Sequence, residues 1–358
     1  MTAWLRTLGE GAGSGDAALV IIFWTVLVLT GLSGLLAIAA TLLRVAHLYQ
    51  EARCARLWAS WTPVLLDVLA GDAEPEALEQ RVGPRDRAAF VRFLLQYVFT
   101  IKGQEVRQLE RLAMPHLPVM ERFLRRRDPH ERVQGIQALG LLGHDKHAAA
   151  VLDALDDRSD LVAMTAAQIL SRRGDPVHAA AVVDRLERFR RWGLSHVTSM
   201  LTGFGPGAAP LLLWVYADAS RELFARIVAG EALRWLNRLE AADVAAEILT
   251  SGADPELVAV SLRLLRRLGQ ASHADVVRAF CDSPEAIVRI HAVSALAALS
   301  GRTEADALRA AFYDPSHWVA MRAARGLRES GHVAVLEEMA ASDHMRAPLA
   351  RQILTEEG

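Results

Sequence analysis

Apolar residues are distributed along this chain in two distinct ways. Near the N-terminus they form one unbroken run, with no charged residue from Ala17 to Leu43. A helix of that length reaches about 40 Å, which exceeds the bilayer hydrocarbon thickness of about 30 Å. The run therefore predicts a transmembrane helix over residues 17–43. Beyond it, short apolar stretches alternate with polar turns, which is typical of amphipathic helices that meet water on one side.

Past residue 115 the apolar stretches recur at a fixed period. One leucine per unit repeats in steps of 31 or 32 residues, at Leu139, Leu170, Leu201, Leu233, Leu265, Leu296 and Leu327. Each unit holds two helical patterns, and no segment shows the period of two that strands require. A single helical hairpin cannot bury its own apolar face, so the period predicts an all-α stack of about seven to eight hairpins, an α-solenoid.

Turn residues mark the ends of the second helix in each unit. Asp or Ser followed by Pro precedes three of these helices, where the first residue caps free amides and Pro fits the first turn: Asp254-Pro255, Ser283-Pro284 and Asp314-Pro315. Glycine follows four of them, where a left-handed residue is favoured: Gly143, Gly174, Gly269 and Gly331.

These patterns divide the chain into four parts. A short N-terminus over residues 1–16 is followed by the transmembrane helix over 17–43, a helical connector over 44–114 and the solenoid over 115–358. Within the connector, helices are predicted over residues 58–71, 86–99 and 104–113.

The basic residues beside the apolar run predict its orientation. Only Arg6 precedes the run, whereas Arg44, Arg53 and Arg56 follow it. Because cytoplasmic flanks carry the excess of Lys and Arg, we expect a single-pass membrane protein with its short N-terminus outside and its solenoid in the cytoplasm. A cleaved signal peptide is the alternative, since residues 37–39 have the form of a cleavage site, but the run is about twice as long as a signal-peptide core.

Composition narrows the classes of function. The net charge of −2 argues against a nucleic-acid binder. Cys54 and Cys281 stand far apart, which fits neither a disulfide framework nor a zinc site. The sequence contains none of the common hydrolase, metalloprotease or P-loop motifs. His144 and His147 share a helical spacing without a third ligand, and the glycine-rich residues 203–207 read as a turn. We therefore predict no catalytic residue, no cofactor and no metal.

A row of polar positions on the second helices is the candidate binding surface. Its two columns lie three residues apart, so they share one helix face. The row changes from amides at Gln134 and Gln168 to arginines toward the C-terminus, which suits an acidic partner surface as well as an ordinary solvated face. Three tryptophans lie on or near this row and are either packing residues or anchors for a partner: Trp192, Trp235 and Trp318. The candidate partner-binding residues are His196, Glu231, Trp235, Arg263, Arg267, His291, Arg322 and Arg325.

Three stretches give the chain a family resemblance. Residues 130–143, 286–301 and 317–331 resemble the HEAT-repeat superfamily, in particular its short bacterial HEAT-like, or phycobilisome-lyase-type, repeats. The resemblance implies an α-solenoid, and the superfamily contains scaffolds, adaptors and some lyases. An arginine common in these repeats is present at 132, 226 and 289 but is alanine at 163 and 320, which predicts an interrupted Asp–Arg ladder between repeats.

The overall plan is similar to a second, narrower group. An apolar helix with Phe23-Trp24 near its start, the string RDR at 85–87 and a final LARQIL resemble bacterial inner-membrane HEAT-repeat proteins found beside exopolysaccharide glycosyltransferases. That resemblance implies a membrane glycosyltransferase as the protein partner.

These observations favour a membrane-anchored scaffold or adaptor that binds a protein partner. One alternative is a structural subunit of an envelope assembly. The other is a lyase of the phycobilisome type, for which a transmembrane anchor is out of place. The sequence leaves the oligomeric state open.

Overall fold

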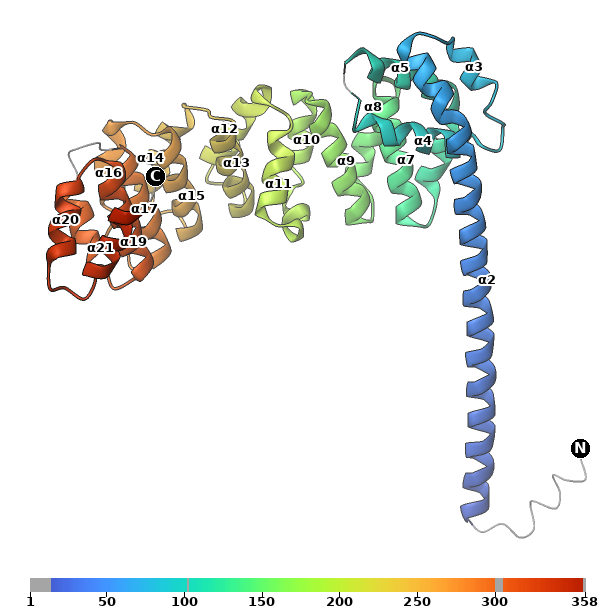
Figure 1. Cartoon of the computed structure of the whole chain (residues 1–358), viewed down its shortest axis with the longest axis horizontal. Coiled ribbons are helices and arrows are strands. Elements are labelled where there is room, and N and C mark those ends of the chain that lie inside the picture. The colour runs from blue at the N-terminus through green and yellow to red at the C-terminus, as the bar shows by residue number, and fades with distance from the viewer. Residues whose placement is uncertain (1–13, 102, 300–304, 357–358) are drawn as a thin grey trace, which may run out of the picture. The chain divides into compact units, whose positions relative to one another are not determined.

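The computed structural model describes residues 14–101, 103–299 and 305–356, and this part of the chain is helical without a strand (Figure 1). The chain divides into two compact units, Met1–His116 and Leu117–Gly358. The all-α class predicted from the periodicity is confirmed.

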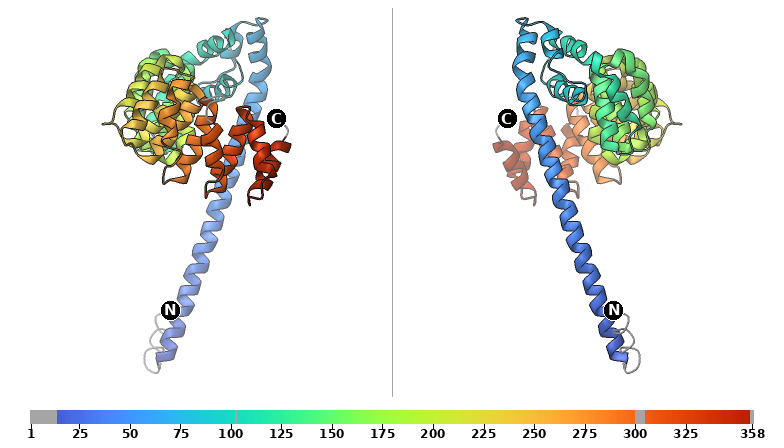
Figure 2. Two further views of the ribbon diagram at one scale, coloured as in Figure 1. Left: turned by 90° about the vertical axis from the view of Figure 1, so that its left-hand side faces the viewer. Right: turned by 90° about the vertical axis from the view of Figure 1, so that its right-hand side faces the viewer.

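The first unit is built on one long helix. α2 (Ser14–Ala70) is followed by α3 (Pro75–Glu79), α4 (Arg87–Val98), α5 (Gln104–Ala113) and the 3-10 turn η1 (Met114–His116). The apolar run and the first predicted connector helix are parts of this single element, which Figure 2 shows as uninterrupted. Residues 44–57 lack Gly and Pro and are rich in Ala, Leu and Arg, so nothing in them ends the helix.

The two ends of α2 have different surroundings. Its apolar side chains from Leu19 to Leu43 are exposed, and α2 is long and apolar enough to cross a membrane. Toward its C-terminal end, Trp61 is fully buried with its ring centroid 5.3 Å from that of Phe90 and 5.5 Å from that of Phe93. Both phenylalanines lie on α4, so an aromatic core joins the end of α2 to the helices that follow.

The second unit is a succession of helical hairpins in chain order (Figure 1). Its second helices are α7 (Pro129–Leu142), α9 (Asp160–Arg173), α11 (Leu194–Thr202), α13 (Leu223–Trp235), α15 (Pro255–Leu268), α17 (Ala286–Leu299), α19 (His317–Glu329) and α21 (Ala347–Thr355). The first helices are α6 (Pro118–Glu121) with η2 (Arg122–Arg125), α8 (His144–Asp153) with η3 (Ala154–Asp156), η4 (Pro176–His178) and α10 (Ala179–Val183) with η5 (Leu186–Trp192), η6 (Pro206–Ala208) with α12 (Ala209–Ala217), α14 (Ala241–Thr250), η7 (Ala271–His273) with α16 (Ala274–Arg278), α18 (Ala305–Phe312) and α20 (Val333–Ala341).

The repeating leucines form the core of this stack. All seven, from Leu139 to Leu327, are 0–1% exposed. Buried alanines such as Ala232, Ala292 and Ala323 accompany them, which lets neighbouring helices approach closely.

The turn residues act as predicted at some helix ends only. Asp254 caps α15 by accepting a bond from the Glu256 amide at 2.8 Å. α17 and α19, however, begin two residues after their Ser-Pro and Asp-Pro pairs, which lie in the preceding loops. Gly174 has the expected left-handed backbone, with φ of 71°. Gly269 does not: a Cβ there would lie 2.7 Å from Leu299 Cδ2, so glycine is needed for close packing.

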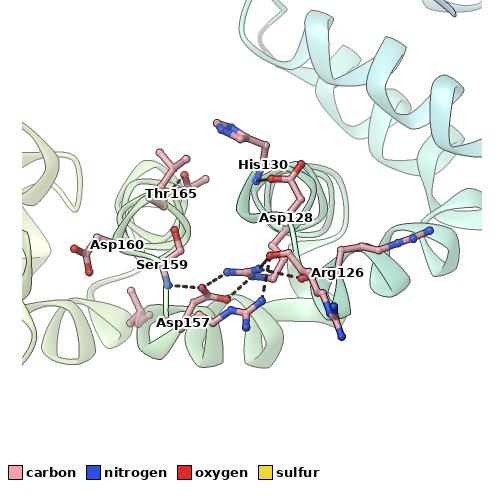
Figure 3. Close-up of polar contacts among 12 residues, drawn as sticks. Arg126, Asp128, His130, Asp157, Ser159, Asp160 and Thr165 are labelled. Carbon is pink, nitrogen blue, oxygen red and sulfur yellow. Dashed lines mark hydrogen bonds and ion pairs between the residues drawn. The ribbon is translucent and has the colours of Figure 1, made fainter. Parts of the chain in front are cut away.

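Arginines tie the loops of successive hairpins together. The Arg132 guanidinium donates to both carboxylate oxygens of Asp157 at 2.8 and 2.9 Å, and to the carbonyls of Arg126 and Arg127. Figure 3 shows Asp157 at the centre of this contact, also accepting the amide of Ser159. Burial alone would raise the pKa of Asp157, but the hydrogen bonds from Arg132 and Ser159 outweigh it and hold the pKa below its ordinary value.

The same contact recurs five units later, on α17. Arg289 donates to both oxygens of Asp314 at 2.7 and 3.0 Å, and to the carbonyls of Ser283 and Pro284. At Ala163 the contact formed by Arg132 and Asp157 has no counterpart, as the alanine predicts, and Arg188 instead donates to the carbonyls of Leu155 and Asp157.

Candidate binding groove

A groove of about 620 Å³ lies in the middle of the second unit, on α11, α13 and α15. It is lined by Leu194, Ser195, Thr198, Ser199, Thr202, Glu231, Arg234, Trp235 and Arg263. All three helices are second helices, so their side chains come from equivalent positions of successive repeats. The volume lies within the range of roughly 300–1,000 Å³ that small-ligand and side-chain sites occupy.

Glu231 is the buried centre of the groove. Only 5% of this residue is exposed. Its Oε1 accepts a hydrogen bond from Arg263 Nε at 2.8 Å and lies 2.6 Å from Arg263 Nη2, and its Oε2 accepts one from Arg234 Nε at 2.8 Å and lies 2.7 Å from Arg234 Nη2. Two guanidiniums therefore share one carboxylate. The cluster carries an excess of one positive charge, and Glu231 holds both arginines in fixed positions.

Trp235 forms an exposed aromatic surface beside this cluster. The residue is 56% exposed, although it is the last residue of α13. The guanidinium carbons of Arg234 and Arg267 lie 5.0 and 5.8 Å from its ring centroid, within the range of cation–π contacts. Arg267 also donates to Asn237 Oδ1 at 2.8 Å. Trp235 is therefore not a core residue; two arginines hold it at the surface.

The part of the groove that α11 lines is rich in hydroxyl groups. Ser195, Thr198, Ser199 and Thr202 follow helical spacing on α11, so they share one side of it. Thr202 donates to the Ser199 carbonyl at 2.8 Å. Thr198 is only 4% exposed, and its Oγ1 has no hydrogen-bond partner among the described residues. A buried hydroxyl without a partner is uncommon and costly, so the groove holds unused hydrogen-bonding capacity.

His291 extends the cluster onto α17. Arg263 Nη1 donates to its Nε2 across 3.2 Å. Burial, followed by the positive charges of Arg263 and Arg322, lowers the pKa of His291 to about 4. The imidazole is therefore neutral at physiological pH and accepts the bond from Arg263.

The structure brings together most of the candidate residues predicted from sequence. Glu231, Trp235 and Arg263 line the groove, while Arg267 and His291 contact its residues. His196 lies on α11, where it stacks on Trp192 and bonds Gln168 at 2.8 Å. Arg322 and Arg325 lie farther along, on α19, and Arg325 forms an ion pair with Glu356 at 3.0 Å.

The row itself is less exposed than its polarity suggests. Gln168, His196 and Ser199 are exposed, but Thr165, Glu231 and Ser294 are buried. Sequence reasoning also missed Arg234 and Thr198. Arg234 had a signal, because it stands three residues after Glu231 on the same helix, whereas nothing in the sequence distinguishes Thr198 from its neighbours.

No group of three His, Cys, Asp or Glu side chains in the described ranges is placed to hold a metal ion. The His144 side chain lies outside the described residues, and His147 lies 3.6 Å from Glu121. The glycine-rich residues 203–207 join α11 to η6, as the predicted turn.

A stack of two-helix repeats is an α-solenoid, and in this chain a polar groove lies on the second helices of the stack. The family model described as HEAT repeats matches residues 117–195 and 242–328, so these two stretches of the solenoid are HEAT repeats, as the sequence resemblance implied. No curated protein sequence matches the chain.

Several solved structures are similar in fold. Kap121p shares 13% identity over 78% of this chain, with a TM-score of 0.47. Human deoxyhypusine hydroxylase shares 19% over 78% of this chain and 98% of its own, with a TM-score of 0.31. An engineered protein shares 16% over 57% of this chain and 94% of its own, with a TM-score of 0.33. The chain spans 38% of the length of Kap121p.

Proposed function

We propose that this chain is a membrane-anchored scaffold whose solenoid holds a protein partner through the second-helix face at α11, α13 and α15. The observation that carries the proposal is the groove there, where exposed Trp235 adjoins a cationic cluster on a stack of HEAT repeats. HEAT-repeat solenoids are typical of protein-interaction scaffolds, and exposed Trp and Arg are the residue types that most often anchor interfaces.

In this proposal α2 is the anchor. Its exposed apolar residues cross the membrane over 17–43, and the helix continues from Arg44 to the buried Trp61, about 25 Å farther on. The first unit is thus attached to the membrane by a continuous helix instead of a flexible linker. Tethering raises the local concentration of the binding face near membrane partners, so a modest affinity is enough for stable occupancy.

The partner to test first is a membrane glycosyltransferase of exopolysaccharide synthesis, which the resemblance of the overall plan implies. We propose no catalytic activity for the groove. Each oxygen of Glu231 already accepts one guanidinium N–H group and lies within 2.7 Å of a second guanidinium nitrogen, which makes this carboxylate a poor general base.

Site-specific photocross-linking in native membranes tests the proposal. A photoreactive residue is placed at Gln168, Ser199 or Arg267 on second helices, with the 78%-exposed Val177 of η4 as the matched control position. A discrete cross-linked protein from the second-helix positions and none from Val177 is the expected result. Equal labelling from all four positions, or none from any, would contradict it.

A further inference from the structure

The groove on α11, α13 and α15 has a charge and a geometry that select its ligand. In both Arg234 and Arg263, the Nε and Nη2 edge of the guanidinium contacts the carboxylate of Glu231. A guanidinium is a planar fork with a second edge that can also pair with a carboxylate. Arg263 uses its Nη1 on His291, whereas Nη1 of Arg234 has no partner among the described residues. One bidentate position on Arg234 is therefore open.

The surroundings favour an anion at that position. Among the described residues that line the groove, Glu231 is the only acidic one, against Arg234 and Arg263, and Arg267 adds its charge beside Trp235. Since Glu231 already immobilises both arginines, an incoming carboxylate does not have to order them. Pre-ordered donors raise affinity because the entropy loss has already occurred on folding.

The hydroxyl wall favours a chain segment over a free ion. Ser195, Thr198 and Ser199 supply donors and acceptors on the side facing the arginines, and the Thr198 hydroxyl lacks a partner within the fold. A peptide offers backbone N–H and C=O groups to such a wall while one of its side chains reaches Arg234. Trp235 at the margin provides apolar surface for the same segment.

Resting on the scaffold proposal, we infer that this groove binds an acidic segment of the partner, with an aspartate or glutamate carboxylate on the open edge of Arg234. The segment lies between the hydroxyls of α11 and the Arg234–Glu231–Arg263 cluster. The groove is thereby the specificity-determining part of the second-helix face.

Fluorescence anisotropy on the purified full chain in detergent tests this inference. The probe is a fluorescein-labelled peptide of alternating aspartate and glutamate, and its matched control carries asparagine and glutamine. We expect the acidic peptide alone to bind, with salt-sensitive affinity. R234M should weaken binding about tenfold or more, because it removes the open edge and leaves the Glu231–Arg263 pair in place. T198V should weaken it severalfold without lowering the melting temperature.

R191M is the matched charge control, since Arg191 is an exposed arginine that pairs with Asp160 away from the groove. Its affinity should stay within about twofold of the wild type. Three results would each overturn the inference: equal binding of the two peptides, a loss of affinity in R191M as large as in R234M, or binding of free succinate without the peptide.

The cross-linking experiment separates this inference from the scaffold proposal. If cross-linking at Ser199 persists while the acidic peptide fails to bind, the carboxylate assignment is wrong and the scaffold proposal stands. Loss of the cross-link itself refutes the scaffold proposal.

Discussion

Arg188 occupies the role in its repeat that Arg132 fills one repeat earlier, although the two residues lie on different elements. Arg132 donates from α7 to the carbonyls of the loop that precedes its own helix. The equivalent position on α9 is Ala163, and there Arg188 reaches back from η5 to the Leu155 carbonyl at 2.8 Å. Farther along, Arg346 does the same for the loop before α19, where the helix carries Ala320. One loop contact is thus maintained by arginines from two sequence positions.

This loop contact predicts that two substitutions on different elements, R132M and R188M, lower the free energy of unfolding by similar amounts. R132M removes a buried guanidinium and R188M a partly buried one, and each leaves loop carbonyls without their donor. Each should lower the free energy of unfolding by about 2–4 kcal/mol, measured by urea denaturation. R191M, an exposed ion-pair arginine of the same element as Arg188, should change it by less than about 0.5 kcal/mol. A stable R188M protein would show that the Arg188 contacts contribute nothing.

The buried leucines predict the positions at which a substitution lowers the stability of the solenoid most. Leu233→Asp places a charge at a fully buried position and should cost several kcal/mol, whereas Leu239→Asp, at a 63%-exposed position, should be nearly neutral. Because each repeat contacts only its neighbours, hydrogen exchange should rise first in α11, α13 and α15. Uniform acceleration along the whole solenoid would contradict the stacking.

His291 predicts a dependence of stability on pH. Its pKa of about 4 in the folded chain lies below the unfolded value near 6.5, so between these values only the unfolded state binds the proton. Stability should therefore fall as the pH drops from about 6.5 to 4, by on the order of 2–3 kcal/mol, and stay flat above 7.

H291Q keeps an acceptor for Arg263 but cannot titrate, so its stability should fall less over this range. Asp157 and Asp314, whose pKa values are lowered in the folded chain, add to the loss of stability only toward pH 4, where the unfolded carboxyls begin to bind protons. Equal slopes for wild type and H291Q would show that another group titrates.

The basic residues that follow the apolar run within α2 predict the orientation of the chain in the membrane. Arg44, Arg53 and Arg56 follow the apolar run, so a C-terminal reporter should be active in the cytoplasm and inactive in the periplasm. A periplasmically active reporter would reverse the orientation. A mature chain beginning near Ala40 would instead identify the run as a cleaved signal peptide.

The fold could be predicted from the sequence because the buried leucines recur at a fixed period. Seven leucines at one spacing left little choice beyond stacked hairpins, and all seven are buried. The site was harder to predict, since polarity alone does not report exposure: Glu231 belongs to the polar row yet is buried between two arginines, while Trp235 is apolar yet exposed. The loop contact of Arg188 could not be assigned, because the acceptors in that contact are backbone carbonyls whose directions depend on loop conformation.

The central claim is that a membrane-bound partner is held on the second-helix face. Its most direct test is the yield of the species cross-linked through Ser199 in native membranes, from the full chain and from a chain beginning at residue 44. The account predicts a discrete partner band from the full chain and less than about a tenth of it from the shortened one, because the tether supplies the effective concentration. An equal yield from the folded, shortened chain, or no band from the full chain, would contradict it.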